Sequence, residues 1–284
     1  MKRHLKEERL VSVTFPIHKK HEFADLALNS ILNQTHHRVE VLFLDNSLSG
    51  LRDSFDFTDK RIRYFRLSPS FGLADTLNFA IDEAQGTYLA RMDYDDIALP
   101  ERIAVQVEFM EEHPDVGVSG TNILIIGNAI DKNVSPGQEV KREFIHENIT
   151  RNLLTKNAFF HPTVIFKLSE IRKHNLRYRA SYDSAEDLDL WCRASRVLKL
   201  ANIDRALLKY RLHPNQYSRL DGASSDYFAN KARIQHAIWL IKTKRIEFFT
   251  GLKVCIKLTY KMIFLLPKKK RSSFKKFAQI LDNA

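Results

Sequence analysis

The sequence predicts an α/β protein with a mostly parallel central sheet and flanking helices, followed by a basic helical tail. Before Pro214, short apolar runs alternate with segments of helical period, which is the pattern of βαβ units. Two of these runs end at aspartates, and ligands bind beyond the carboxyl ends of parallel strands. The net charge of +11 is concentrated near the end, because residues 231–284 carry 14 Lys and Arg against two acids.

The first half of the chain alternates regularly between strands and helices. We expect strands over residues 10–16, 39–44, 61–65 and 87–92, and helices over residues 23–33 and 73–84. Pro16 is expected to end the first strand, because proline cannot donate a ladder hydrogen bond. In this interpretation the helices connect parallel strands of one sheet.

The second half continues the pattern with less regular spacing. We expect helices over residues 99–112, 144–154 and 169–174 and from residue 184 onward, and strands over residues 116–126, 161–166, 198–203 and 206–210. Ser184 is expected to cap its helix, with Asp187 in a capping-box-like position. After Pro214 the pattern changes to long basic helices. We therefore divide the chain into a folded domain over residues 1–218 and a tail over residues 219–284.

Three carboxylates stand together in residues 93–96 (Asp-Tyr-Asp-Asp), directly after the expected strand 87–92. Like charges this close repel unless a cation neutralises them. A divalent ion with oxygen ligands, Mg²⁺ or Mn²⁺, suits such a cluster, and a nucleoside diphosphate commonly completes its shell. The alternative is an acidic turn that caps the helix near Leu99. Asp45, at a neighbouring strand end, favours the metal interpretation.

Composition argues against several classes of protein. Without the tail the chain is close to neutral, so the folded domain is not expected to bind nucleic acid. Cys192 and Cys255 are the only cysteines, which excludes a disulfide framework or a cysteine-rich zinc site. Residues 1–9 contain no apolar stretch of the kind that a secretory signal has. No uncharged apolar run approaches the roughly 18–20 residues that a membrane span needs.

Short segments spread over residues 10–218 resemble family 2 glycosyltransferases with the GT-A fold. They are Val11–Pro16, Ser30–Thr35, Leu44–Ser47, Phe71–Asn78, Arg91–Asp96, Pro100–Ile103, His161–Thr163, Ala185–Trp191 and Tyr210–His213. The resemblance implies an inverting, metal-dependent enzyme that moves a single sugar from a nucleotide-sugar, expected to be a UDP-sugar, to a saccharide acceptor. Two departures are Ser70, where the family often has asparagine, and residues 175–179, which lack the family's glycine near the acceptor pocket.

The resemblance also implies roles for residues near the metal. Asp95 would ligate the metal, and Asp93 would meet the metal or the ribose. His213 would be a further metal ligand, and Arg211 would offset diphosphate charge; the alternative for both is an ordinary surface residue. Asp96 has no assigned role, and a hydrogen bond to the main chain is as consistent with its position as a direct one.

The same resemblance implies that other residues recognise the base and transfer the proton. Asp45 would accept a hydrogen bond from the base or the ribose, with Phe15 near the same base; the alternative for Asp45 is an Asx-turn. Asp187 would be the catalytic base that takes the proton of the acceptor hydroxyl, and a helix N-terminus would keep it ionised. The alternative is that Glu186 is the base and Asp187 only caps the helix.

Residues 252–276 predict a basic amphipathic anchor. Lys253, Lys257 and Lys261 share one helical face opposite a broad apolar face, and residues 268–271 add four more cations. Such a helix is typical of peripheral contact with an anionic membrane, and the alternative is packing on the catalytic domain. Membrane contact suits a lipid-linked acceptor. We therefore expect a cytoplasmic protein, peripheral on the inner face of a bacterial inner membrane, that works in polysaccharide or lipopolysaccharide assembly.

Two other functions remain open at this point. A sugar nucleotidyltransferase also uses a parallel sheet with paired aspartates, but it would want a glycine-rich phosphate loop, and residues 10–20 contain no glycine. A non-catalytic, membrane-associated saccharide-binding module would not need Asp93, Asp95 and Asp187.

Overall fold

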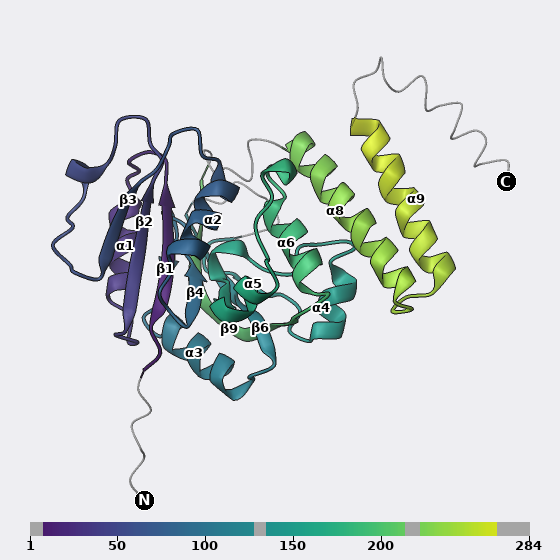
Figure 1. The fold of residues 1–284 in the computed structure, drawn as a ribbon, viewed down its shortest axis with the longest axis horizontal. Helices are drawn as coiled ribbons and strands as arrows, with labels where there is room; N and C mark the ends of the chain where they lie inside the picture. The colour runs from purple at the N-terminus through teal and green to yellow at the C-terminus, as the bar shows by residue number, and fades with distance from the viewer. Residues whose placement is uncertain (1–7, 128–134, 214–221, 266–284) are drawn as a thin grey trace, which may run out of the picture.

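The computed structural model describes residues 8–127, 135–213 and 222–265. Figure 1 shows a central sheet with helices packed around it and two long helices at one end. The described strands are β1 Val11–Ile17, β2 Val39–Asp45, β3 Ile62–Arg66, β4 Tyr88–Arg91, β5 Ile97–Ala98, β6 Val116–Gly127, β7 Glu139–Val140, β8 Ile165–Lys167 and β9 Lys199–Leu212. The described α-helices are α1 Ala24–Leu32, α2 Leu73–Glu83, α3 Arg102–Glu112, α4 His146–Asn152, α5 Leu168–Lys173, α6 Glu186–Ala194, α8 Gly222–Lys242 and α9 Phe248–Leu265.

The strands follow the order β3-β2-β1-β4-β8-β6-β9-β5, with β7 paired to β6. The predicted parallel βαβ arrangement is confirmed for β1 to β4. Beyond β4 the sheet is mixed: β6 and β9 pair in parallel, whereas β8 runs antiparallel to both β4 and β6, and β5 and β7 are antiparallel to their partners. The predicted mostly parallel sheet is confirmed, because most paired residues belong to the parallel pairings β1–β2, β1–β4, β2–β3 and β6–β9. No described helix separates β4 from β5, so that connection reverses the chain.

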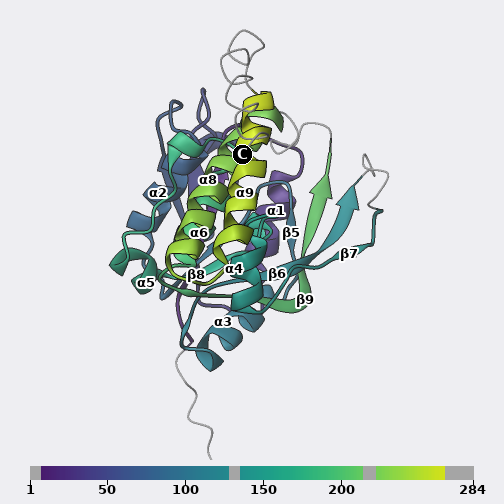
Figure 2. The same cartoon turned by 90° about the vertical axis from the view of Figure 1, so that its right-hand side faces the viewer.

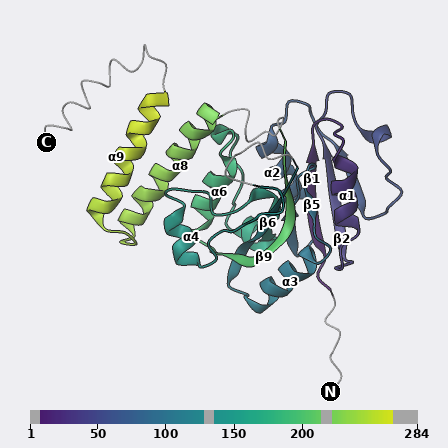
Figure 3. The same cartoon turned by 180° about the vertical axis from the view of Figure 1, so that it is seen from behind.

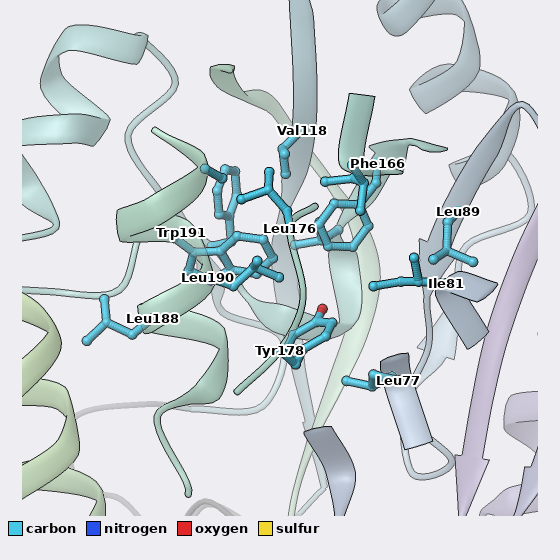
Figure 4. Packing of buried hydrophobic residues seen from close by; sticks show 14 of the residues in the cluster. Leu77, Ile81, Leu89, Val118, Phe166, Leu176, Tyr178, Leu188, Leu190 and Trp191 are labelled. Carbon is cyan, nitrogen blue, oxygen red and sulfur yellow. The ribbon is translucent and has the colours of Figure 1, made fainter. Parts of the chain in front are cut away.

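Helices cover both faces of the sheet. On one face α1 and α3 bury Ile31 and Ile103, each with 0% exposure. On the other face, Leu77 of α2, Phe166 of β8 and Trp191 of α6 belong to one apolar cluster (Figure 4). Trp191 is fully buried and stacks on Phe166, with ring centroids 5.7 Å apart. This packing fixes α6 to the sheet, and with it the position of the carboxylates at its N-terminus.

Three predicted boundaries are wrong, each for a local reason. Pro16 lies inside β1, which continues to Ile17. The pairing of β1 with β4 already stops at Thr14, so the N–H that proline lacks interrupts no hydrogen bond between these two strands. His161–Thr163 is a 3₁₀ turn rather than strand, with proline at one of its first positions. The two short strands expected between residues 198 and 210 are one strand, β9, whose pairing with β6 contains register shifts.

The described part of the tail consists of two long helices, as expected, and they form a hairpin. α8 packs on α6, and α9 packs on α8, so that α9 is the outermost helix in Figures 1 and 3. Figure 2 views the molecule from this end, with α9 in front of α8. Among the described helices, none is both long and apolar enough to cross a membrane. The domain division after residue 218 stays a prediction, and residues 266–276 of the expected anchor lie outside the described residues.

Candidate active site

The acidic residues 93–96 form the turn that leaves β4, a strand in the middle of the sheet. One carboxylate oxygen from each of Asp93, Asp95 and Asp96 lies within 4.8 Å of the other two. The predicted gathering of three carboxylates at a strand end is therefore confirmed. The helix-cap alternative is not formed, since α3 begins at Arg102 with Glu101 at its N-cap and no side-chain capping bond.

The end of β9 brings two more predicted residues to this turn. His213 Nε2 lies 3.0 Å from Asp95 Oδ2, and their side chains are only 11% and 13% exposed. The main-chain N–H of Arg211 donates to Asp96 Oδ1 at 2.8 Å, and its Nε donates to the main-chain oxygen of Asp95 at 2.8 Å. Neither Arg211 nor His213 is an isolated surface residue. Asp96 bonds the main chain through one oxygen, as one alternative predicted.

Two buried arginines beside the carboxylates were not predicted. Arg91, the last residue of β4, forms an ion pair with Asp93. Arg102 at the start of α3 has 0% exposure and donates through Nη2 to the main-chain oxygen of Arg91 at 2.7 Å. Burial lowers the pKa of Arg102 to about 9, and the charge of Asp96 opposes this shift. A charged residue in an otherwise apolar strand needs a buried partner, and this was the signal in the sequence for Arg91.

Histidine and tyrosine rings border the same carboxylates. The ring centroid of His21 lies 5.5 Å from that of Tyr94 and 5.3 Å from that of His213, and His18 lies 5.7 Å from Tyr94. Burial lowers the pKa of His18 and of His21, while the negative charge of Asp95 opposes both shifts. His21 was missed; its signal was a position just beyond the carboxyl end of β1.

Asp45, at the end of β2, has a side chain with 0% exposure whose two oxygens are both hydrogen bonded. Oδ1 accepts from the main-chain N–H and the hydroxyl of Ser47, at 2.9 and 2.6 Å, and Oδ2 accepts from the N–H of Leu51 and the Tyr64 hydroxyl, both at 2.6 Å. Arg66 Nη1 adds an ion pair at 3.3 Å. The Asx-turn alternative is therefore present, and a contact between Asp45 and a base stays a prediction.

Phe15 lies in the core beneath the expected base site. Its side chain has 0% exposure, and its ring centroid is 5.4 Å from that of Phe43. The whole residue is enclosed by the packing of β1 and β2, so a contact between Phe15 and a base stays a prediction.

The second group of carboxylates stands at the start of α6. Ser184 is not its N-cap, which corrects the prediction: the N-cap is Ala185, without a side-chain capping bond, and Ser184 has a positive φ of 59°. Glu186 is 7% exposed and Asp187 is half-buried. Asn157 Nδ2 donates to Asp187 Oδ2 at 2.6 Å, which orients that carboxylate.

Burial and mutual repulsion set the charge state of this pair. Burial first, and then the charge of Asp187, raises the pKa of Glu186 to about 7. Burial also raises the pKa of Asp187, while its hydrogen bonds from Asn157 and from the main chain oppose the shift. The positive charge of Arg91 opposes the rise in pKa at Glu186, at Asp187 and also at Asp93. Arg91 therefore acts electrostatically on both groups of carboxylates.

Changing Glu186 to Gln is expected to alter how stability depends on pH. The pKa of Glu186 is raised from 4.5 to about 7 on folding, so its carboxyl destabilises the folded chain increasingly as pH rises through that range. Between about pH 5 and pH 8, the free energy of unfolding of the wild type should fall by ~1–3 kcal/mol relative to the Gln variant. Urea unfolding at several pH values measures this, and parallel profiles would contradict it.

The acidic turn fits a divalent cation. Its three carboxylates supply hard oxygen ligands on one side of a turn. Asp96 Oδ2 is buried and has no hydrogen-bond partner among the described residues. A buried carboxylate oxygen of this kind needs a bound ion or a proton. Burial and the charge of Asp95 raise the pKa of Asp96 well above its usual range. A bound cation would reverse that shift and complete the contacts of Asp96.

The site contains two groups of carboxylates near the carboxyl ends of parallel strands. One group suits the ion of a nucleoside diphosphate, the other suits proton transfer, and the charge of Arg91 acts on both. That combination is what a GT-A glycosyltransferase needs to join a nucleotide-sugar to an acceptor. The chain belongs to glycosyl transferase family 2, whose family model matches residues 12–169. The protein is thus a glycosyltransferase, and neither a nucleotidyltransferase nor a non-catalytic module.

Relatives and solved structures agree with this class. An uncharacterized glycosyltransferase of Haemophilus influenzae is 29% identical over 84% of this chain and 76% of its own length. The O-antigen biosynthesis glycosyltransferase WbnJ of Escherichia coli is 31% identical over 72% of this chain and 80% of its own length. TarS of S. aureus in complex with UDP-GlcNAc matches with a TM-score of 0.65 and 16% identity, covering 92% of this chain and 82% of that one.

A second solved structure binds a different donor. The mannosyltransferase PcManGT of Pyrobaculum calidifontis, in complex with GDP-Man and Mn²⁺, matches with a TM-score of 0.56 and 14% identity. It covers 96% of this chain and 80% of that one. At these identities the two structures establish the GT-A fold.

Proposed function

We propose that this enzyme transfers a single sugar from a nucleotide-sugar, a UDP-sugar in the first instance, to a saccharide hydroxyl, with Mn²⁺ or Mg²⁺ and with inversion at the anomeric carbon. The observation that carries the proposal is the meeting of Asp93, Asp95, Asp96 and His213 at the carboxyl end of β4. The UDP-GlcNAc complex of TarS and the GDP-Man and Mn²⁺ complex of PcManGT support the same ligands.

In this proposal the two groups of carboxylates have different parts in the reaction. Asp93, Asp95 and His213 would hold the ion, which balances the charge that grows on the departing nucleoside diphosphate. Arg211 adds positive charge at the same edge and anchors the turn through the main chain of Asp95. Asp45 would contribute to recognition of the base by holding the loop of residues 47–51 in place through its hydrogen bonds.

Acceptor activation belongs to the start of α6 in this proposal. Asp187, oriented by Asn157, takes the proton of the acceptor hydroxyl as its oxygen attacks the anomeric carbon from the face opposite the leaving group. Glu186, with a pKa near 7, is the second candidate for this role. Arg91 lowers the cost of placing negative charge on either residue.

The setting is proposed from the relatives and from the tail. WbnJ acts in O-antigen biosynthesis, which supports a role in polysaccharide or lipopolysaccharide assembly. An acceptor in such assembly can be carried on a lipid. We therefore also propose that residues 252–276 make peripheral contact with the inner face of a bacterial inner membrane.

A donor screen tests the proposed reaction. Purified full-length protein is incubated with UDP-, GDP- and dTDP-sugars, with Mn²⁺, Mg²⁺ or EDTA, and the release of nucleoside diphosphate is measured. We expect release with at least one donor in the presence of a divalent ion and its loss in EDTA. Turnover that is equally fast in EDTA would contradict the metal assignment. The anomeric configuration of the product, determined by NMR, tests inversion.

A further inference from the structure

The distribution of apolar residues around α9 differs from the sequence prediction, which placed one apolar face opposite one lysine face. The apolar residues of the helix are divided between two sides. Gly251 and Leu258 are buried toward α8, and a Cβ on Gly251 would come within 2.4 Å of the Ile241 side chain, so the two helices approach closely there. Val254 and Cys255 pack with the small cluster formed by the hairpin and Leu154 of the preceding domain.

A second apolar group on α9 faces away from the protein. It consists of Phe249, Leu252, Ile256 and Tyr260, with exposures of 74%, 40%, 46% and 53%; we call these residues the outer row. Their spacing of three or four residues places them along one side of the helix. Phe248 extends the row at the start of α9, with 59% exposure. Exposed apolar side chains gathered in this way mark a contact surface more often than isolated ones do.

Lysines border the outer row. Lys253, Lys257 and Lys261 are exposed and each follows a residue of the row by one position. The helix Phe248–Leu265 contains no acidic residue, and residues 222–265 carry eight Lys and Arg against two acids. The surface therefore combines apolar contact with positive charge, which complements an anionic lipid surface and disfavours a symmetric contact between two copies of the same helix.

We infer that the outer row of α9 inserts into the headgroup region of an anionic membrane, with the three lysines reaching back to lipid phosphates. A helix lying in the interface buries its apolar side only partway, and lysine stems allow the charged ends to stay at the polar surface. This inference rests on the proposed transfer to a lipid-linked acceptor. Such insertion would also hold α6, two helices inward from α9 in Figure 1, near the membrane surface.

Vesicle binding tests this surface in the full-length protein. Phosphatidylcholine vesicles with and without phosphatidylglycerol are sedimented with the wild type and with the Leu252→Ser/Ile256→Ser variant. We expect binding of the wild type to phosphatidylglycerol vesicles and about tenfold weaker binding of the variant. The Lys253→Gln/Lys257→Gln variant should lose about fivefold per lysine, and only on anionic vesicles. The matched control is Leu26→Ser/Val197→Ser, which removes exposed apolar side chains elsewhere and should bind like the wild type.

The outcomes separate this inference from the proposed reaction. Nucleoside diphosphate release, measured without vesicles, should be the same for the wild type and all three variants. Failure of the wild type to bind phosphatidylglycerol vesicles, or equal binding by the outer-row variant, would overturn the inference while leaving the reaction in place. A concentration-dependent dimer that the outer-row variant abolishes, without vesicle binding, would assign the row to a second copy and would also overturn it.

Discussion

Replacing Asp95 with asparagine is expected to lower metal-dependent sugar transfer by about 100-fold or more. Asp95 is the carboxylate that meets His213 at 3.0 Å and lies within the three-carboxylate cluster, so its loss removes a charged ligand from the centre of the proposed metal site. The amide keeps the shape of the side chain but not its charge. Initial rates over a Mn²⁺ titration measure the effect.

A matched control distinguishes loss of the site from loss of the fold. Asp115→Asn changes an exposed aspartate that pairs with Lys199 far from the turn, and it should keep wild-type rates. Calorimetric titration of Mn²⁺ in the presence of UDP should show weaker binding to Asp95→Asn than to Asp115→Asn. If Asp95→Asn showed wild-type rates and an unchanged Mn²⁺ dependence, the residue would not be a metal ligand.

Replacing Asp187 with asparagine is expected to reduce transfer by about 10²–10⁴-fold while donor binding is kept. The amide oxygen can still accept the hydrogen bond from Asn157, so the side chain should keep its place at the start of α6. An amide cannot take the proton of the acceptor hydroxyl. Transfer rates, together with the dissociation constant of the nucleoside diphosphate, separate the two effects.

Glu186→Gln is the comparison that decides which carboxylate is the base. Glu186 is the more buried member of the pair, and its pKa of about 7 also suits proton transfer. If Asp187 is the base, Glu186→Gln should cost much less than Asp187→Asn. The reverse order, with near wild-type transfer by Asp187→Asn, would transfer the role to Glu186.

Much of the candidate site could be predicted because local patterns carried it. The turn 93–96 follows an apolar strand, and its carboxylates gather as their spacing suggests. The contact of Asp95 with His213, which is far away in the chain, was expected from family resemblance rather than from any local pattern.

Other features depended on contacts that no single segment encodes. Arg91 and Arg102 make sense only once β4 and α3 are packed together beside the carboxylates. The helix cap at Ala185 rather than Ser184 follows from a positive φ at Ser184 that its sequence neighbours do not require. The two apolar sides of α9 could not be told apart until α8 covered one of them.

Arg91 and Arg102 also bear on how the protein is made. Both are buried cations supplied by the chain itself beside Asp93 and Asp96, so part of the carboxylate charge is offset before any ion binds. We therefore expect the chain to fold before it binds an ion. In the proposed reaction the ion would then arrive with each donor molecule and leave with each spent nucleotide, so it would not be a permanent part of the enzyme.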